Sequence, residues 1–351
     1  MKILQVIDTL DVGGAERMLV TLTNLLYRKG VSVSIMILVR SGNLRQELDE
    51  GIVVYELHRN KRYENGKMKQ FASILSQFDI IHTHLKHNYR YTALSAKRFG
   101  ITIPKLIFHD HSHTLMTTKW SLKYLKDSLF KSILKPKHYI GVSQANCDWA
   151  VSYLKLMPSQ CYLLPNVIEK QTIVPQEDTL RKGLVMVGNI SRIKHIEFAI
   201  RLTHQLNMPL TIYGRIKDVI YYKELMALIM ELGLEEKITF IHDCNDIQRE
   251  LHAYQYGIHT ALKETGPLVL IEYLAQGLPF VSSASGQVYE TLKKELPECF
   301  MDSYDMEAWI HQLTALHNLD KNRLEVLYNQ YFSSNEYVKQ CLSIYQNIQN
   351  S

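Results

Sequence analysis

The chain has 351 residues, of which 46% are hydrophobic and 21% charged, with a formal net charge of +5. This length allows two domains that each bury a core, and this composition is typical of a soluble globular protein. The longest apolar run, IMILV at 35–39, is far too short to span a bilayer. Residues 1–8 lack the longer apolar core and cleavage site of a secretory signal, and the five scattered cysteines form no disulfide or zinc pattern. We therefore expect a cytoplasmic protein.

Short apolar, β-branched runs alternate with helical patterns through the first half of the chain. Continuous apolar runs of this kind are typical of parallel strands that are buried on both faces. A helix is predicted at 15–29, with a leucine-rich stripe and with Gly30 where a C-terminal cap is expected. The predicted strands lie at 3–8, 31–39, 52–57, 79–84, 105–111, 138–143 and 161–165.

The alternation begins again after a polar linker at 165–183, which contains two prolines. Helices are predicted at 221–233 and 268–276, and strands at 183–189, 210–214, 238–242, 256–261 and 278–283. The sequence therefore predicts two doubly wound, Rossmann-like α/β domains in tandem. Ligands of such sheets bind at the carboxyl ends of the strands, so we expect these ends of the two domains to face one cleft.

Two loops that follow predicted strands are suited to anions. Gly13 and Gly14 stand between the first strand and the first helix, where glycines allow a close backbone approach and helix N–H groups are open. The stretch VGNISRIKH places Arg192 and Lys194 after another strand, where they could neutralise a diphosphate. Gly13 and Gly14 could equally belong to an ordinary tight turn, and Arg192 and Lys194 could equally belong to an ordinary solvated loop.

Histidines cluster at two predicted strand ends, His82 and His84 in the first and His109, His111 and His113 in the second. Alternate residues of an extended segment share a face, so a metal site has to be considered. The second cluster partly matches a histidine pattern of metallohydrolases, but it has no aspartate at the position that this pattern requires. A single histidine that positions a substrate hydroxyl is the favoured interpretation.

The stretch KETGPLVLIEYLAQGLPF (263–280) holds two carboxylates in an apolar run. We expect Glu264 on a loop, Pro267 in the first helical turn and Glu272 about one turn further in. Because a helix start suits a phosphate, the two acids could hold hydroxyl groups on either side of it. This arrangement predicts a sugar-nucleotide site.

Residues 119–137 carry six lysines and one aspartate beside a leucine and isoleucine stripe with aromatic neighbours. Such a helix can rest on an anionic bilayer. It can equally pack its stripe onto the sheet as an ordinary surface helix.

Along nearly its whole length the chain resembles the retaining glycosyltransferases of the GT-B architecture, in the family GT4 (glycosyl transferases group 1). The spacing of Glu264 and Glu272, the inner Gly-Pro and the trailing AQGLP make the last of the matching stretches the most specific. The stretches are GGAER (13–17), DIIHTH (79–84), FHDH (108–111), VSQANCDW (142–149), LPNVIE (164–169), VGNISRIKH (187–195) and ETGPLVLIEYLAQGLPFVSS (264–283).

The resemblance implies a role for each matching residue. Glu272 would hold the ribose, Glu264 would contact the donor sugar, and Lys194 would stabilise the leaving phosphate. Asn189 stands where the family usually has arginine, so Arg192 could supply that charge. His109 best matches the active-site histidine, with His111 as the alternative. The remaining implied positions are the diphosphate-binding backbone of Gly266, Pro267, Leu268 and Val269, the cleft-lining Gly13 and Gly14, the donor-side Gly214, and Asn166 of the Pro-Asn element.

The resemblance also implies the domains and the reaction. It predicts an acceptor-side domain at 1–168, a donor-side domain at 169–330 and a helix at 331–351 that crosses back to the first domain. The expected activity is retaining transfer of a sugar from a UDP- or GDP-linked donor to a glycan or lipid-linked glycan, in bacterial surface polysaccharide biosynthesis. We expect no cofactor, no metal and no nucleic-acid partner, and peripheral contact with the inner face of the plasma membrane.

Two alternatives stay open from the sequence. One is a metal-dependent hydrolase that uses His109, His111 and His113. The other is a non-catalytic protein that binds sugar nucleotides, which the asparagine at position 189 would favour.

Overall fold

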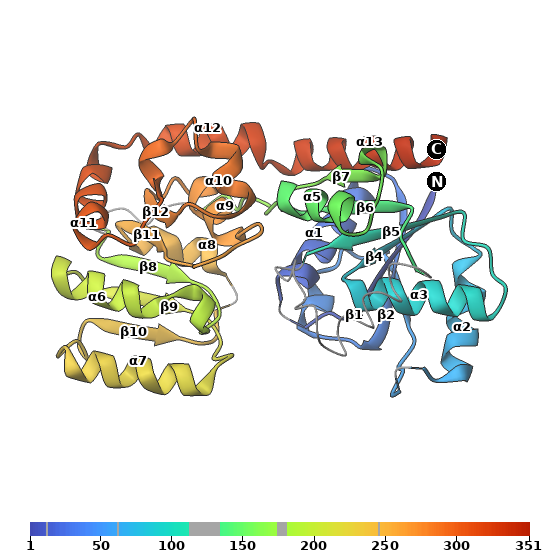
Figure 1. The fold of residues 1–351 in the computed structure, drawn as a ribbon, viewed down its shortest axis with the longest axis horizontal. Coiled ribbons are helices and arrows are strands. Elements are labelled where there is room, and N and C mark those ends of the chain that lie inside the picture. Colours follow the sequence, from blue (N-terminus) through green and yellow to red (C-terminus); the bar gives the residue numbers. More distant parts are fainter. Residues whose placement is uncertain (12, 62, 112–133, 174–180, 245) are drawn as a thin grey trace. The chain divides into compact units, whose positions relative to one another are not determined.

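Only parallel strands pair in the two sheets of the computed structural model, which describes residues 1–11, 13–61, 63–111, 134–173, 181–244 and 246–351. The chain divides into two units (Figure 1). Unit 1 comprises Met1–Val167 with Ser334–Ser351, and unit 2 comprises Ile168–Ser333. The division thus falls within the predicted linker, and the last helix belongs to unit 1.

Unit 1 contains a seven-stranded sheet in the order β3-β2-β1-β4-β5-β6-β7. The order reverses between β1 and β4, which is the switch point where doubly wound sheets bind ligands. Its strands and helices are β1 (Lys2–Thr9), α1 (Gly14–Arg28), β2 (Ser32–Arg40), β3 (Val53–Glu56), α2 (Asn65–Leu75), β4 (Ile80–His84), α3 (Lys86–Arg98), β5 (Lys105–Asp110), β6 (His138–Gly141), α5 (Gln144–Ser152), β7 (Cys161–Leu163) and α13 (Ser334–Asn350).

Unit 2 contains a six-stranded sheet in the order β10-β9-β8-β11-β12-β13, with its switch point between β8 and β11. Its strands and helices are β8 (Leu184–Val187), α6 (Ile196–Leu206), β9 (Leu210–Tyr213), α7 (Val219–Glu231), β10 (Ile238–Ile241), α8 (Ile247–Glu250), β11 (Tyr256–His259), α9 (Leu268–Ala275), β12 (Phe280–Ser283), α10 (Gly286–Leu292), β13 (Phe300–Met301), α11 (Met306–Ala315) and α12 (Lys321–Tyr331).

The predicted fold of two Rossmann-like α/β domains is confirmed, and so is every predicted strand, to within a few residues at its ends. The apolar runs of the central strands are buried on both faces, as in Ile3, Leu4 and Val6 of β1, none of which is exposed. Burying one such side chain contributes roughly 1.5–3 kcal/mol. β13 was not predicted, because its two paired residues are too few to form a pattern.

Helix α13 owes its place in unit 1 to an apolar stripe. The stripe recurs at helical spacing and lies against the unit, and α13 packs against α1 (Figure 1). Its buried members are Tyr337, Val338, Cys341, Ile344, Tyr345 and Ile348. The C-terminal segment is therefore part of the core of unit 1, although it is more than 150 residues from the rest of that unit in the sequence.

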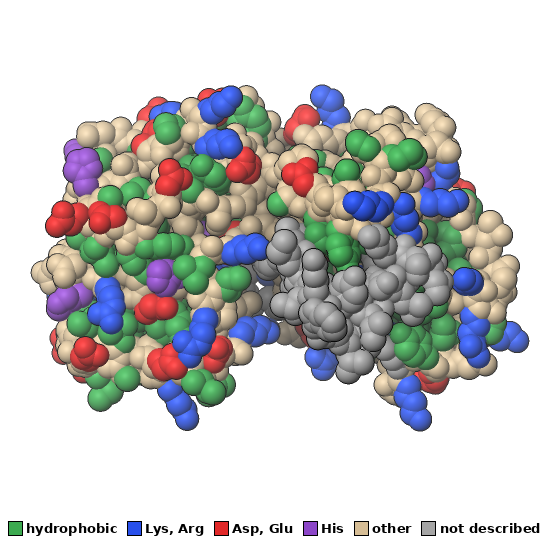
Figure 2. All heavy atoms as spheres, in the orientation of Figure 1, with side chains coloured by type: hydrophobic (Ala, Val, Ile, Leu, Met, Phe, Trp, Pro, Cys, Tyr) green, Lys and Arg blue, Asp and Glu red, His purple; other side chains and the backbone are tan. Residues whose placement is uncertain are grey.

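Side chains of both charges lie on the face drawn in Figure 2. Basic and acidic side chains are mixed there over the described part of each unit. Among the helices in the described ranges, none is both long enough and apolar enough to cross a membrane. Most of the basic segment predicted at 119–137 lies outside the described residues, as does His113.

Candidate functional site

A charged cluster lies at the carboxyl ends of β8 and β11 in unit 2. A 3₁₀ turn at Arg192–Lys194 follows β8, and the loop after β11 carries Glu264. Lys194 Nζ forms an ion pair with Glu264 Oε1, and the side chains are 19% and 4% exposed. His259 Nε2 lies 3.3 Å from the same carboxylate oxygen, and His259 Nδ1 lies 3.1 Å from Ser282 Oγ. The structure thus brings together two of the predicted residues, Lys194 and Glu264.

The surroundings of Glu264 keep it ionised. Burial by itself would raise the pKa of this carboxyl, but the hydrogen bond from His259 and the charge of Lys194 outweigh burial and hold its pKa well below the usual range. Burial lowers the pKa of His259, although Glu264 opposes that shift. A neutral His259 therefore donates its Nε2–H to a charged Glu264, and Lys194 keeps two further N–H donors for a ligand.

The start of α9 lies next to this cluster in the chain. The helix begins at Leu268, where the predicted helix begins. Pro267, expected in the first turn, is instead the N-cap residue, and its side chain makes no capping hydrogen bond. Glu272 lies one turn into the helix and is 9% exposed. The first N–H groups of a helix have no partner within the helix and carry a partial positive charge. Such a helix start, which includes Val269, offers donors to a phosphate.

The other residues of unit 2 that were predicted to bind the sugar-nucleotide donor have different surroundings. Arg192 Nη2 lies 2.6 Å from Glu224 Oε1 of α7, so Arg192 is paired away from Lys194. Asn189 is exposed in the loop after β8. Gly214 has a steric role, because a Cβ there would lie 1.9 Å from the carbonyl oxygen of Gly188. Only glycine permits the ends of β8 and β9 to approach so closely.

The glycine loop of unit 1 precedes α1, as predicted. Gly13 is the N-cap residue of α1, in an extended conformation, and Gly14 is the first helical residue. A Cβ on Gly13 would lie 2.3 Å from Glu16 Oε2, so the Glu16 carboxylate folds back over the loop. Burial raises the pKa of Glu16. This helix start already has a carboxylate beside it.

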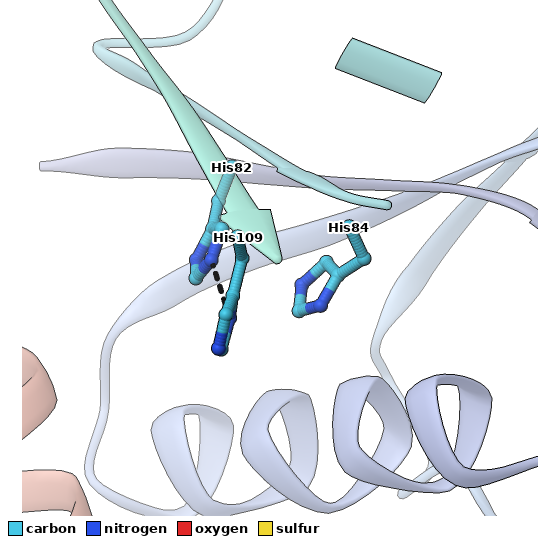
Figure 3. Close-up of side chains that lie close together, drawn as sticks. All are labelled: His82, His84 and His109. Atoms are coloured by element: carbon cyan, nitrogen blue, oxygen red, sulfur yellow. Dashed lines mark hydrogen bonds between the residues drawn. The ribbon is translucent and has the colours of Figure 1, made fainter. Parts of the chain in front are cut away.

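Four histidines of unit 1, His82, His84, His109 and His111, lie together on one face of the sheet. Strand register pairs Gln5 with His82 and His84 with His109, and alternate residues share a face. Figure 3 shows the rings of His82 and His109 side by side with a hydrogen bond between them, and His84 next to both. His111 follows at the end of β5, and its ring stacks on His84 at a centroid distance of 5.2 Å. The predicted alternatives His109 and His111 therefore belong to one cluster.

Hydrogen bonds connect this cluster to a residue of α13. His82 Nδ1 lies 2.7 Å from the Tyr345 hydroxyl, and His82 Nε2 lies 3.1 Å from His109 Nδ1. His84 Nδ1 lies 2.9 Å from His111 Nε2, and His84 Nε2 lies 2.8 Å from Gln5 Oε1. Gln5 Nε2 in turn donates to the Tyr345 hydroxyl over 3.3 Å.

All four histidines are neutral at physiological pH. Burial lowers the pKa of His82 and His111 to about 3 and holds those of His84 and His109 well below their usual range. Ring nitrogens of His82, His84 and His109 lie within 4.8 Å of one another, and neutral imidazoles are metal ligands. Five of the six ring nitrogens of this trio already have hydrogen-bond partners outside the trio or within it, and only His109 Nε2 has none among the described residues.

Comparison with known proteins adds the family. A family model described as glycosyl transferases group 1 matches residues 167–331, and one described as glycosyltransferase family 4 matches residues 12–171. The chain is a nucleotide-sugar-dependent glycosyltransferase of the GT4 type.

Individual relatives of this glycosyltransferase agree with that assignment. A Campylobacter jejuni protein named N-acetylgalactosamine-N,N'-diacetylbacillosaminyl-diphospho-undecaprenol 4-alpha-N-acetylgalactosaminyltransferase is 26% identical over 289 residues, which cover 77% of each chain. Anabaena Alr3699/HepE, solved with UDP and glucose, is 18% identical and has a TM-score of 0.82 over 99% of each chain. A Rickettsia africae glycosyltransferase is also 18% identical, with a TM-score of 0.79 over 99% of this chain and 98% of its own. The likeness to these solved structures supports the GT-B fold.

Three residues of the glycosyltransferase's two clusters were not predicted as site residues. His259 ends a buried strand, and a histidine in such an apolar run is a signal that the sequence does contain. Gln5 and Tyr345 lie in β1 and α13, each surrounded by core residues, so nothing local distinguishes them. Asn166 lies between β7 and unit 2, and its predicted role stays a prediction.

Membership of the glycosyltransferase family decides between the open alternatives at the level of enzyme class. A metal-dependent hydrolase and a non-catalytic binding protein are both set aside as primary functions, because both family models and the named relative are glycosyltransferases.

Proposed function

We propose that the enzyme transfers a sugar, with retention of anomeric configuration, from a UDP- or GDP-linked donor to a glycan or lipid-linked glycan in bacterial surface polysaccharide biosynthesis. The observation that carries the proposal is the buried Lys194–Glu264–His259 cluster beside the uncapped start of α9. The name of the Campylobacter relative gives a diphospho-undecaprenol-linked sugar as acceptor, and the Anabaena structures contain UDP. Both support the proposed substrate classes.

Unit 2 carries the residues proposed to bind the sugar-nucleotide donor. Breaking a glycosyl–phosphate bond develops negative charge on the diphosphate, so fixed cations and N–H groups around the leaving group lower the barrier. Lys194 supplies such a cation, and its ion pair with Glu264 holds it in place. Glu264 is the residue proposed to contact the donor sugar. Leu268 and Val269 at the start of α9 supply backbone N–H donors, and Glu272 accepts hydrogen bonds from the ribose hydroxyls.

Unit 1 carries the residues proposed to bind the acceptor. Its glycine loop has the Glu16 carboxylate beside it, which opposes a phosphate there and favours the hydroxyl groups of a sugar. The neutral His109 suits the same ligands, since it can form a hydrogen bond with a sugar hydroxyl. Glycine loop and histidine therefore both fit a carbohydrate rather than a diphosphate.

The decisive experiment is calorimetric titration with UDP, GDP and their common sugar conjugates in the presence of a chelator. Glu272→Ala should weaken binding of one nucleotide by roughly 1–3 kcal/mol, as for a lost charge-assisted hydrogen bond. Glu298→Ala, which removes an exposed carboxylate paired with Arg323, is the matched control and should bind normally. Equal binding to wild type and Glu272→Ala would contradict the assignment of the ribose contact.

Stereochemistry and location need separate measurements. Proton NMR of the first product formed should show a new glycosidic bond with the same anomeric configuration as the sugar of the donor. A product with the opposite configuration would exclude retention. Peripheral membrane contact through residues 119–137 is proposed on the sequence alone. It predicts flotation with anionic vesicles at low salt, and complete recovery in the soluble fraction would exclude it.

A further inference from the structure

Two chains of hydrogen bonds in unit 1 begin at one amide, that of Gln5. The two ends of an amide are not equivalent, because its oxygen only accepts and its nitrogen only donates. Gln5 Oε1 lies 2.8 Å from His84 Nε2, so His84 carries its proton on Nε2. Gln5 Nε2 donates to the Tyr345 hydroxyl oxygen over 3.3 Å. The Tyr345 oxygen is therefore an acceptor toward Gln5, and its own proton points elsewhere.

The proton of the Tyr345 hydroxyl has two possible acceptors, the sulfur of Cys341 and Nδ1 of His82. A thiol sulfur accepts weakly, whereas an imidazole nitrogen accepts well. The 2.7 Å contact to His82 therefore takes the proton. Since a neutral imidazole carries one proton, that of His82 is on Nε2.

The same rule decides the state of the next ring. His82 Nε2 lies 3.1 Å from His109 Nδ1, so His82 donates and His109 accepts. The single proton of His109 is then on Nε2. This nitrogen is buried and has no hydrogen-bond partner among the residues that the structure describes. An unsatisfied buried donor is unfavourable, and a ligand oxygen would satisfy it.

We propose that Gln5 and Tyr345 are positioning residues that, through His82, hold His109 as the tautomer protonated on Nε2. His109 then offers a hydrogen-bond donor to an oxygen of the bound carbohydrate and does not act as a proton acceptor. This inference rests on the proposed function for the carbohydrate alone; the tautomer follows from the contacts within unit 1. It also gives the C-terminal helix a part in the reaction, because Tyr345 of α13 acts on His109 through His82.

Nitrogen NMR of protein labelled with ¹⁵N-histidine tests the proposal, since two-bond couplings identify the protonated nitrogen of each ring. His109→Gln and His82→Gln assign the signals. The wild type should have His109 protonated on Nε2. Tyr345→Phe, which removes the donor to His82, should shift His109 toward the other tautomer. It should also lower kcat/KM for transfer about tenfold, as expected for one lost hydrogen bond, with nucleotide affinity unchanged. Cys341→Ala, on the same face of α13, should alter neither.

Gln5→Glu provides a second variant with a different prediction. A carboxylate accepts from both neighbours, so the Tyr345 hydroxyl would donate to it and the chain through His82 would reverse. His109 should then be protonated on Nδ1, while His84 keeps its proton on Nε2. Protonation of His109 on Nδ1 in the wild type, or an unchanged tautomer in both Tyr345→Phe and Gln5→Glu, would overturn the proposal. The expected tautomers in a protein without transferase activity would uphold the hydrogen-bond chain and reject the proposed function.

Discussion

The strands of the two sheets follow the same order, but the side chains at their carboxyl ends differ in charge. In unit 2, Lys194 and Glu264 are both charged and paired, and a neutral His259 donates to the carboxylate. In unit 1, burial keeps four clustered histidines neutral, and they interact through hydrogen bonds alone. One fold therefore supplies fixed charge at one set of strand ends and uncharged hydrogen bonding at another, which suits the proposed donor and acceptor roles of the two units.

The largest effect is expected from removing the cation of unit 2. Lys194→Ala should lower kcat by about 10²–10³, as does loss of one group that stabilises developing negative charge. Steady-state transfer kinetics measure it, with Lys237→Ala as the control, because Lys237 is an exposed lysine that contacts Asn207 at the edge of unit 2. A change in KM alone would mean that Lys194 binds the donor equally in ground and transition states.

Neutralising the carboxylate of the same pair tests its part in stability. Glu264→Gln should destabilise unit 2 by about 1.5–3 kcal/mol, the usual contribution of hydrogen bonds to a charged group. Because the folded pKa of Glu264 lies below its ordinary value, its stabilisation is present above pH 4.5 and is lost as the pH falls further. Hydrogen exchange of unit 2 should therefore detect a gap between wild type and variant that narrows in acid. A gap that stays constant below pH 4.5 would contradict the charged state assigned to Glu264.

The neutral cluster of unit 1 should respond to acid at a higher pH. Its histidines have folded pKa values below the ordinary 6.5, so the unfolded chain binds protons that the folded one does not. The free energy of unfolding of unit 1 should fall below pH 6.5 by about 1.4 kcal/mol per pH unit for each such histidine. His111→Gln should reduce this slope by about one proton, and His317→Gln in unit 2 should leave it unchanged. Equal slopes for wild type and His111→Gln would refute the neutral state.

The smallest effect is expected from Arg192. Its guanidinium is exposed and already paired with Glu224, so Arg192→Ala should lower stability and kcat/KM far less than Lys194→Ala does. Comparing it with Lys194→Ala measures how much of the charge on the donor side comes from each residue. A loss as large as that of Lys194→Ala would mean that Arg192 leaves Glu224 and replaces the arginine missing at Asn189.

Different parts of the two clusters were accessible to sequence reasoning. Lys194 and Glu264 were predicted as site residues because strand ends, a Gly-Pro helix start and charged residues are local patterns. The prediction that Arg192 could assist the phosphate depended on where a long side chain points, and α7 supplies Glu224 as a partner from over 30 positions away. Gly214 was predicted to lie on the side that binds the sugar-nucleotide donor. In the structure, its lack of a side chain allows two strand ends to approach closely.

The sequence by itself determined the two doubly wound sheets, because buried parallel strands and amphipathic helices have periods of hydrophobicity that span only a few residues. It also determined which strand ends carry histidines and which carry charges. Only the tertiary structure decided which of these groups touch. Strand register brings Gln5 beside His82, and α13 returns from the other end of the chain to place Tyr345 against the same ring. Such contacts depend on the packing of elements that are distant in sequence, and no local pattern encodes them.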